Sequence, residues 1–280
     1  MSTTATQTTS ARVVAIANQK GGVGKTTTAV NVATWLALDG ATVLLVDLDP
    51  QSNATTGLGI DNRRANLSTY NVLVEQTPVE EAIVPTTVER LSVLPSTIDL
   101  AGAEIELVPA MSRELRLRRA LDPILDRFDY VVIDCPPSLG LLTVNALAAA
   151  GEVMVPIQCE YYALEGLGQL LRNINLIKQH LNPGLKFSGI VLTMFDPRTR
   201  LAEEVVREVR GHFEGLVYDT VVPRSVRLSE APSFGQPIAV YDPRSKGSEA
   251  YREVAREMAA DHHAAVPQPP GQGDPAEGGS

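Results

Sequence analysis

The stretch Gln19-Lys20-Gly21-Gly22-Val23-Gly24-Lys25-Thr26-Thr27 decides the fold of this 280-residue chain. The apolar run 13–17 before it predicts a buried strand, and the apolar positions within 29–37 after it predict a helix packed on that strand. A strand, a glycine-rich turn ending in Gly-Lys-Thr and a helix are typical of a phosphate-binding loop. Its backbone N–H groups and the helix N-terminus attract phosphate oxygens. The stretch therefore predicts a nucleotide-binding site.

Each residue of this loop has an expected role. We expect Lys25 to reach the β and γ phosphates and the Thr26 hydroxyl to hold Mg²⁺. The residues expected to contact the nucleotide are Lys20, Gly21, Gly22, Val23, Gly24, Lys25, Thr26 and Thr27. A glycine-rich turn that binds nothing is the alternative, but the strand and helix around the loop favour the phosphate site.

The loop departs from the generic pattern at its start. Gln19 stands where glycine is usual, and an extra lysine, Lys20, follows it. A solvated surface lysine is one interpretation of Lys20. The chain has only five lysines against nineteen arginines, and two of the five lie in this loop. This distribution favours a role for Lys20 at the phosphates.

Strand and helix patterns alternate over the rest of the chain. We expect strands at 41–48, 91–94, 130–134, 152–157, 188–194 and 216–222, and helices at 112–127, 141–150, 161–181, 200–213, 225–228 and 248–260. This alternation predicts an α/β fold with a doubly wound, mostly parallel sheet flanked by helices on both faces. We expect one domain at 12–262, disordered ends at 1–11 and 263–280, and a mobile loop at 52–66.

Carboxylates follow two of the predicted strands. Asp47 and Asp49 close the strand at 41–48, and Asp134 ends the strand at 130–134, about a hundred residues after the loop. Ligands of open α/β sheets bind at the carboxyl ends of the strands, so we expect these side chains beside the loop. Asp134 matches a Walker B carboxylate, which holds Mg²⁺. For Asp47 and Asp49, a helix-capping or turn role before Pro50 stays open.

Composition limits the classes of function. The 44% hydrophobic content supports a sizeable core, and the chain has neither a run of eighteen apolar residues nor a signal peptide, so we expect a cytoplasmic protein that spans no membrane. Cys135 and Cys159 are expected to be buried and inert.

The net charge of −9 speaks against nucleic-acid binding. Residues 190–256 nevertheless hold ten cationic and ten acidic residues, so a local basic face is possible there.

From about 12 to 258, the chain resembles the ParA/Soj-type chromosome-partitioning ATPases of the ParA/MinD family, which carry a deviant Walker A loop. Besides the loop, the segments that match the family's blocks in order are 46–54, 133–140, 158–166 and 223–232. The resemblance implies an ATP hydrolase that uses ATP and Mg²⁺. It implies a dimer, closed by ATP, in which Lys20 crosses to the partner's phosphates.

The resemblance assigns further roles in the site. It implies that Asp49 positions the water that attacks the γ-phosphate, with Lys20 and Lys25 as the other catalytic residues, and phosphoryl transfer permits this role. The expected metal set is Thr26, Asp49 and Asp134. By fold position alone, Met194 and Pro223 are the candidates for adenine contacts.

The resemblance also implies partners. Family members bind DNA without sequence preference, and a ParB-type centromere-binding protein stimulates their hydrolysis, so a nucleoid-associated location is expected. The matching DNA-binding positions are Arg198 and Arg227, although local ion pairs with Asp196 or Glu230 are an alternative for them. Weaker candidates are Arg224, Arg244 and Lys246, whereas Arg113, Arg116, Arg118 and Arg119 are first interpreted as a solvated helix face.

Two other functions compete with this interpretation. A MinD-like, membrane-cycling division regulator needs a basic amphipathic helix at the C-terminus, which the sequence 262–270 does not provide. A reductase-type relative with an iron–sulfur cluster across a dimer needs exposed thiolate ligands. The contexts of Cys135 and Cys159 do not suggest such a pair. We therefore expect no membrane partner and no cluster.

Overall fold

One sheet organises the computed structural model, which describes residues 11–160, 163–260 and 266–267. Within these residues its eight strands are β1 (Arg12–Ile16), β2 (Val43–Asp47), β3 (Val84–Pro85), β4 (Leu91–Leu94), β5 (Tyr130–Asp134), β6 (Glu152–Gln158), β7 (Lys186–Phe195) and β8 (Val217–Pro223). Their order is β3-β4-β2-β5-β1-β6-β7-β8. Only β3 runs antiparallel to its neighbour among the described strands.

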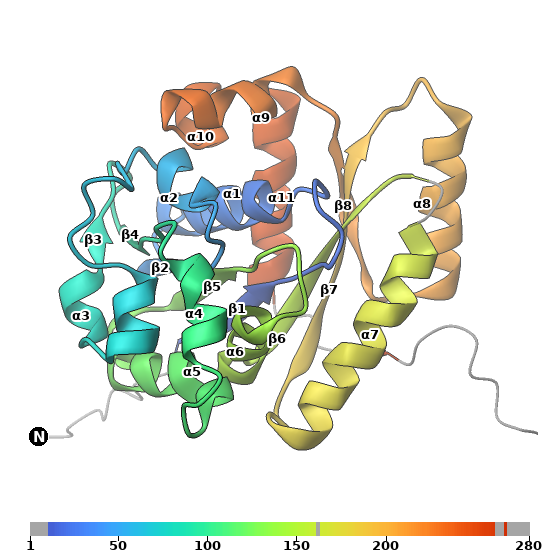
Figure 1. Cartoon of the computed structure of the whole chain (residues 1–280). Coiled ribbons are helices and arrows are strands. Elements are labelled where there is room, and N and C mark those ends of the chain that lie inside the picture. The colour runs from blue at the N-terminus through green and yellow to red at the C-terminus, as the bar shows by residue number, and fades with distance from the viewer. Residues whose placement is uncertain (1–10, 161–162, 261–265, 268–280) are drawn as a thin grey trace, which may run out of the picture.

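Helices cover both faces of this sheet (Figure 1). On one face lie α1 (Lys25–Leu38), α2 (Asn53–Gly57), α9 (Val226–Glu230), α10 (Ile238–Tyr241) and α11 (Lys246–Ala259); on the other lie α4 (Leu100–Glu106), α5 (Arg116–Leu121), α6 (Leu141–Ala149), α7 (Ala163–His180) and α8 (Arg200–His212). Shorter elements are α3 (Val79–Ala82), the π-helix η1 (Asn71–Glu75) and the 3₁₀ helices η2 (Arg113–Leu115), η3 (Asp122–Arg127) and η4 (Ala231–Phe234). The predicted doubly wound α/β fold is confirmed.

The central strand β1 shows why the apolar run of the sequence forms this fold. Its alternate side chains belong to two separate cores: Val14 and Ile16 pack with residues of α1 and α11, and Val13 and Ala15 pack with residues of α6 and α7. Side chains alternate across a strand, so a strand buried on both faces is apolar at every position. This burial holds the loop that follows β1 at a fixed place.

The helix expected at 112–127 is wrong as a single element. The structure divides this segment into η2, α5 and η3. Leu115 leaves the helical region with φ −112°, and Pro123 lies in the first turn of η3. Proline lacks the N–H that would continue the helical ladder, so α5 ends at Leu121.

Two further expectations need correction or fall outside the described residues. The segment 52–66, expected to be a mobile loop, begins with α2. Most of the two ends expected to be disordered, 1–11 and 263–280, lies outside the described residues. Within the second end, Val266 is buried in the core, and the Pro267 carbonyl accepts a hydrogen bond from Asn175 at 3.1 Å, so these two residues differ from that expectation.

Candidate nucleotide-binding site

The glycine-rich loop joins β1 to α1 at the carboxyl edge of the sheet. β1 lies between β5 and β6 and pairs with both in parallel. Asp134 at the end of β5 is in register with Ile16 of β1 and with Asp47 of β2. The sheet therefore places the loop and the predicted carboxylates together, as the parallel topology requires.

Two glycines allow the loop to fold back on itself. Gly22 has φ 75° and Gly24 has φ 89°, a left-handed region that residues with a Cβ rarely adopt. Gly24 caps α1, and its carbonyl accepts the N–H of Thr28 at 2.8 Å. Thr193 of β7 holds the loop from the other side, because its hydroxyl donates to the Val23 carbonyl at 2.8 Å. Sequence reasoning missed Thr193, since no motif marks it.

Lys25 lies in the fold of this loop. Its side chain is buried, and its ammonium group donates to the Lys20 carbonyl at 2.9 Å. Burial lowers the pKa of Lys25, and the nearby Asp134 carboxylate opposes that shift. An ammonium group with three donors and one carbonyl partner can turn to phosphate oxygens, which matches the role predicted for Lys25.

Asp134 is the most unusual group in the site. Its side chain is 0% exposed, and neither carboxylate oxygen has a hydrogen-bond partner among the described residues. Burial, followed by the Asp47 charge, raises the pKa of Asp134 well above its usual range, whereas the nearby Thr26 hydroxyl and Lys25 ammonium oppose the shift. A buried carboxylate without a partner is costly, and a cation would relieve this cost.

The donor set fits Mg²⁺. This ion is usually held by one or two carboxylates together with phosphate oxygens and waters, not by a cage of protein ligands. Asp134 and Thr26 supply such a set, and Asp49 is close enough to influence the pKa of both Asp134 and Lys25. The described part of the chain has no group of three or more His, Cys, Asp or Glu that could hold a metal.

The structure separates the roles of Asp47 and Asp49. Asp47 is fully buried, and its carboxylate accepts the Thr55 N–H at 2.8 Å, the Thr55 hydroxyl at 2.6 Å and the Asp49 N–H at 3.1 Å. Burial raises the pKa of Asp47 to about 6, although the Thr55 hydrogen bonds oppose the shift. Since Thr55 lies in the first turn of α2, Asp47 caps this helix. The Asp49 carboxylate accepts the Gln51 N–H, two residues further along the chain, at 3.0 Å.

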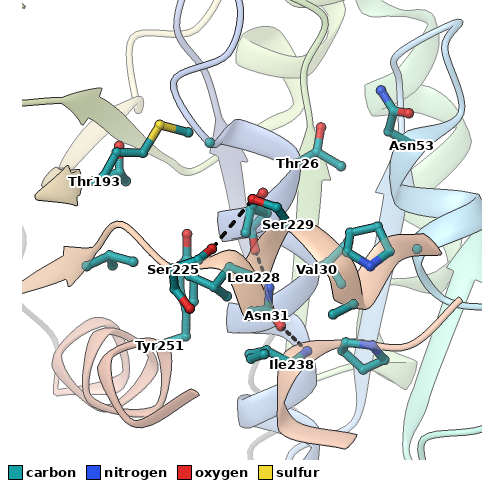
Figure 2. A pocket seen from close by; sticks show the side chains of 18 of the residues that line it. Thr26, Val30, Asn31, Asn53, Thr193, Ser225, Leu228, Ser229, Ile238 and Tyr251 are labelled. Atoms are coloured by element: carbon teal, nitrogen blue, oxygen red, sulfur yellow. Dashed lines mark hydrogen bonds between the residues drawn. The ribbon is translucent and has the colours of Figure 1, made fainter. Parts of the chain in front are cut away.

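A cavity of about 500 Å³ opens beside the loop (Figure 2). Its lining includes Gly24, Thr26 and Thr27 of the loop together with Met194 and Pro223, so the structure brings both predicted adenine candidates to the phosphate loop. The residues that close the cavity from α9 and α10 include Leu228, Ser229 and Ile238.

Asn31 joins the opposite walls of this cavity. Its side chain donates to the Thr27 carbonyl at 2.8 Å and accepts the Ile238 N–H at 2.8 Å (Figure 2). The bond from Ile238 ties α10 to α1 across 207 residues of chain, whereas the bond to Thr27 lies within α1. Sequence reasoning could not find Asn31, because its partner is distant and both residues lie outside the motifs.

Lys20 lies outside the lining of this cavity. Its exposed ammonium group pairs with Glu160 at 3.1 Å in the same chain. Its backbone N–H donates to the Asn18 side chain at 3.0 Å. The predicted contact of Lys20 with a partner's phosphates therefore needs the Glu160 pair to open.

The two predicted DNA-binding arginines are exposed and lie in local ion pairs. Arg198 pairs with Asp196 at 2.6 Å, and Arg227 pairs with Glu230 at 3.1 Å. This is the alternative that the sequence left open for both, and ion pairing does not by itself exclude binding to phosphates. The four arginines at 113–119 do not form one solvated face, because Arg118 and Arg119 are exposed but Arg113 and Arg116 are half-buried.

Both cysteines are buried, as the sequence predicted. Cys135 and Cys159 are free and buried, and burial raises the pKa of both thiols, that of Cys159 to about 11. Thiols of this kind are poor metal ligands at neutral pH. In the part of the chain that the structure describes, no helix is both long and apolar enough to span a membrane.

Comparisons with known proteins agree with this geometry. A family model described as an AAA domain matches residues 11–187. The chain is 57% identical over 249 residues to sporulation initiation inhibitor protein Soj of Bacillus subtilis, covering 89% of this chain and 98% of that protein. It is 56% identical over 247 residues to chromosome partitioning protein ParA of Myxococcus xanthus, covering 88% and 87%.

A solved structure shares the fold and part of the sequence. It is described as cobyrinic acid a,c-diamide synthase from Mycobacterium smegmatis with bound ADP and magnesium, and it is 43% identical to this chain. The match covers 88% of this chain and 93% of that one, with a TM-score of 0.77. From its sequence matches and its phosphate loop, this chain belongs to the ParA/Soj family of chromosome-partitioning P-loop ATPases.

Proposed function

We propose that this chain segregates a chromosome or plasmid by hydrolysing ATP with Mg²⁺, as a dimer that closes on ATP and binds DNA without sequence preference. A ParB-type centromere-binding protein stimulates the hydrolysis, and the protein works at the nucleoid in the cytoplasm. The observation that carries the ATPase chemistry is the buried Asp134 carboxylate, which has no hydrogen-bond partner among the described residues and lies at the phosphate loop. Sequence identity to the partitioning proteins supports the biological role.

The chain's own residues divide the chemistry between them. Lys25 leaves the Lys20 carbonyl and binds the β and γ phosphates. Thr26 and Asp134 would hold Mg²⁺, which would neutralise phosphate charge when bound. Asp49, next to the loop and not engaged in capping α2, orients the attacking water. Thr193 of β7 keeps the loop in place through its hydrogen bond to the Val23 carbonyl.

Dimer closure is assigned to Lys20. Its ammonium group is exposed, and in the part of the chain that the structure describes it pairs with an exposed carboxylate, that of Glu160. Ion pairs between exposed groups are weak, so a partner's triphosphate can compete for Lys20. A dimer formed in this way depends on the γ-phosphate and is released after hydrolysis.

DNA binding is assigned to Arg198 and Arg227. They follow the carboxyl ends of the neighbouring parallel strands β7 and β8. Both are exposed, and exposed guanidinium groups bind phosphates with bidentate geometry. Binding through phosphates has no sequence preference and weakens steeply with salt.

The deciding experiment measures ATP hydrolysis by the full chain alone, with DNA of arbitrary sequence, with a ParB-type protein, and with both. We expect both together to stimulate hydrolysis by more than the product of their separate effects. Hydrolysis that responds to neither would refute the partitioning role. A parallel sedimentation with liposomes and ATP separates the membrane-cycling alternative, for which the protein would cosediment.

A further inference from the structure

Arg198 is held by a carboxylate two residues away. Its Nε donates to Asp196 Oδ1 at 2.8 Å, and its Nη2 donates to Oδ2 at 2.6 Å. The same guanidinium is 85% exposed, and these contacts hold the pKa of Asp196 at about 2. The carboxylate thus occupies one of the edges of the guanidinium, that of Nε and Nη2, through which a phosphate group could bind with two hydrogen bonds.

Arg227 is held in a similar way by two carboxylates. Its Nη1 donates to Glu230 Oε2 at 3.1 Å, and its Nε lies 3.5 Å from Asp242 Oδ2. The Tyr241 hydroxyl also donates to Glu230 Oε2 at 3.2 Å, which orients this carboxylate. The side chain of Arg227 is 56% exposed, so solvent and large ligands can reach it.

Arg198 and Arg227 follow the carboxyl ends of the neighbouring strands β7 and β8, and we call this part of the surface the arginine edge. The Arg224 N–H donates to the Phe195 carbonyl at 2.9 Å, which ties the segment after β8 to the segment after β7. Three acids, Asp196, Glu230 and Asp242, therefore lie beside the two arginines. A phosphodiester backbone that approaches this edge meets arginines whose charge is compensated and some of whose donors are already engaged.

We propose that Asp196, Glu230 and Asp242 limit the affinity of this edge for phosphodiester polyanions by competing with phosphates for Arg198 and Arg227. The proposal rests on the proposed function, since it takes these arginines as the DNA-binding groups. Exposed ion pairs contribute little to stability, so they yield to DNA without unfolding the segment. The free energy needed to break each ion pair nevertheless makes DNA binding weaker by that amount.

The segments that carry these pairs begin at the nucleotide cavity. Met194 lines the cavity two residues before Asp196, Leu228 and Ser229 line it within α9, and Ile238 lines it four residues before Asp242. A nucleotide in the cavity contacts the same short segments that position the acids. The pairs are thus placed where the nucleotide state can change their geometry.

The test compares the full-length variant Asp196→Asn with Glu230→Gln against the parent. Binding to a fluorescent DNA duplex of arbitrary sequence is measured at several salt concentrations, with a non-hydrolysable ATP analogue present. We expect affinity to rise by up to about fivefold for each pair, the upper range for an exposed ion pair. Asn at position 196 can still accept the Arg198 N–H that closes the turn, at 3.1 Å in the parent, so the fold is kept.

A control with the same change in net charge separates local competition from long-range attraction. Asp61→Asn with Glu253→Gln also removes two carboxylates from exposed pairs, those with Arg64 at 3.2 Å and Arg256 at 2.8 Å. We expect a smaller gain from this variant. In the background Arg198→Ala with Arg227→Ala, removal of Asp196 and Glu230 should give no more than the control.

The outcomes distinguish the inference from the function on which it rests. If the parent binds DNA, loses affinity in Arg198→Ala with Arg227→Ala, and gains nothing from the amide variants, the competition is refuted and the proposed function stands. An equal gain in the control pair, or a gain that persists without the two arginines, also refutes it. If the parent with the ATP analogue does not bind DNA, the proposed function itself fails.

Discussion

The nucleotide site and the arginine edge treat their charged groups in opposite ways. At the nucleotide site, Asp134 is fully buried, and its oxygens have no hydrogen-bond partner among the described residues. At the arginine edge, Arg198 is largely exposed, and two of its N–H donors bind the Asp196 carboxylate. The buried carboxylate of Asp134 is stabilised when a cation binds. The exposed guanidinium of Arg198 is already stabilised by Asp196, so it gains less when a phosphate binds.

This difference separates chemistry from control. A buried carboxylate without a hydrogen bond raises the free energy of the folded protein. A bound cation removes this unfavourable free energy, and the removal adds to the affinity for the cation. A group that is already paired gains only the difference between two similar ion pairs, so its response depends on salt and on small rearrangements. The buried site suits the catalytic ion, and the exposed edge suits a reversible partner.

The largest effect is expected at Lys25. Lys25→Ala removes the buried ammonium group from the phosphates, and we expect ATP hydrolysis to fall by about a thousandfold, the upper range for loss of one electrostatic contact to the transition state. Circular dichroism should show an unchanged fold, because the hydrogen bond that the Lys25 ammonium group makes within the described residues goes to a carbonyl of the same loop, that of Lys20. Hydrolysis near the parent's rate would contradict the assignment of this loop.

A smaller loss is expected at Asp49. Asp49→Ala removes the carboxylate that orients the water, and we expect hydrolysis to fall by about a hundredfold while ATP binding is kept. Fluorescent ATP binding and phosphate release, measured on the same preparation, separate the two steps. Equal losses in binding and hydrolysis would move Asp49 to the nucleotide contacts, and unchanged turnover would remove it from the mechanism.

Asp47 and Asp134 offer a matched pair, since they are buried neighbours in register. Asp47→Asn places an amide donor opposite an N–H that the carboxylate accepted, so we expect the free energy of unfolding to fall by about 1–3 kcal/mol. Asp134→Asn removes a buried carboxylate whose oxygens accept no hydrogen bond within the described residues and whose charge the nearby Lys25 only partly offsets, so we expect stability without Mg²⁺ to be kept or raised and the stabilisation by Mg²⁺ and ATP to be lost.

Chemical denaturation of both variants, with EDTA and then with Mg²⁺ and ATP, checks this pair. The same loss of stability in both variants under EDTA would mean that Asp134 has a structural partner. That result would remove the contrast between a capping carboxylate and one that waits for a cation.

The sequence predicted the parts of the site that depend on local pattern and on sheet topology. The loop at 19–27 and the strand ending in Asp134 are continuous motifs, and parallel strands bring their carboxyl ends to one edge. Motif spacing and family resemblance therefore located the loop, Asp49 and Asp134 without knowledge of any distant contact.

The remaining parts depend on contacts that no local pattern records. The role of Asp47 follows from α2, which begins within a polar segment that has no helical hydrophobic pattern. Thr193 and the Val23 carbonyl are 170 residues apart. The ion pair of Arg198 depends on the turn at 196–199, where Asp196 accepts the Arg198 N–H. Such contacts become visible only when the chain is folded.

The smallest predicted effect tests the paired state of the exposed edge directly. The hydrogen bonds from Arg198 hold the pKa of Asp196 at about 2, and Arg224 contributes a smaller charge effect. We expect Arg198→Ala to return this pKa towards the ordinary value for aspartate and Arg224→Ala to shift it less. Carboxyl chemical shifts followed by NMR between about pH 1.5 and 6 measure both.

The sign of the linked stability follows from the direction of the shift. A carboxyl whose pKa is lower in the folded state stabilises that state above the ordinary pKa of aspartate, and the contribution is lost as the pH falls towards about 2. In Arg198→Ala this pH dependence of the unfolding free energy should become smaller, because the side-chain hydrogen bonds are lost and the backbone N–H of residue 198 still donates to Asp196, whereas Arg224→Ala should keep most of it. If Arg198→Ala leaves the pKa of Asp196 unchanged, the ion pair between Arg198 and Asp196 does not form in solution. The contrast between the nucleotide site, where Asp134 lacks a hydrogen bond within the described residues, and the arginine edge, where Arg198 is paired, would then be lost.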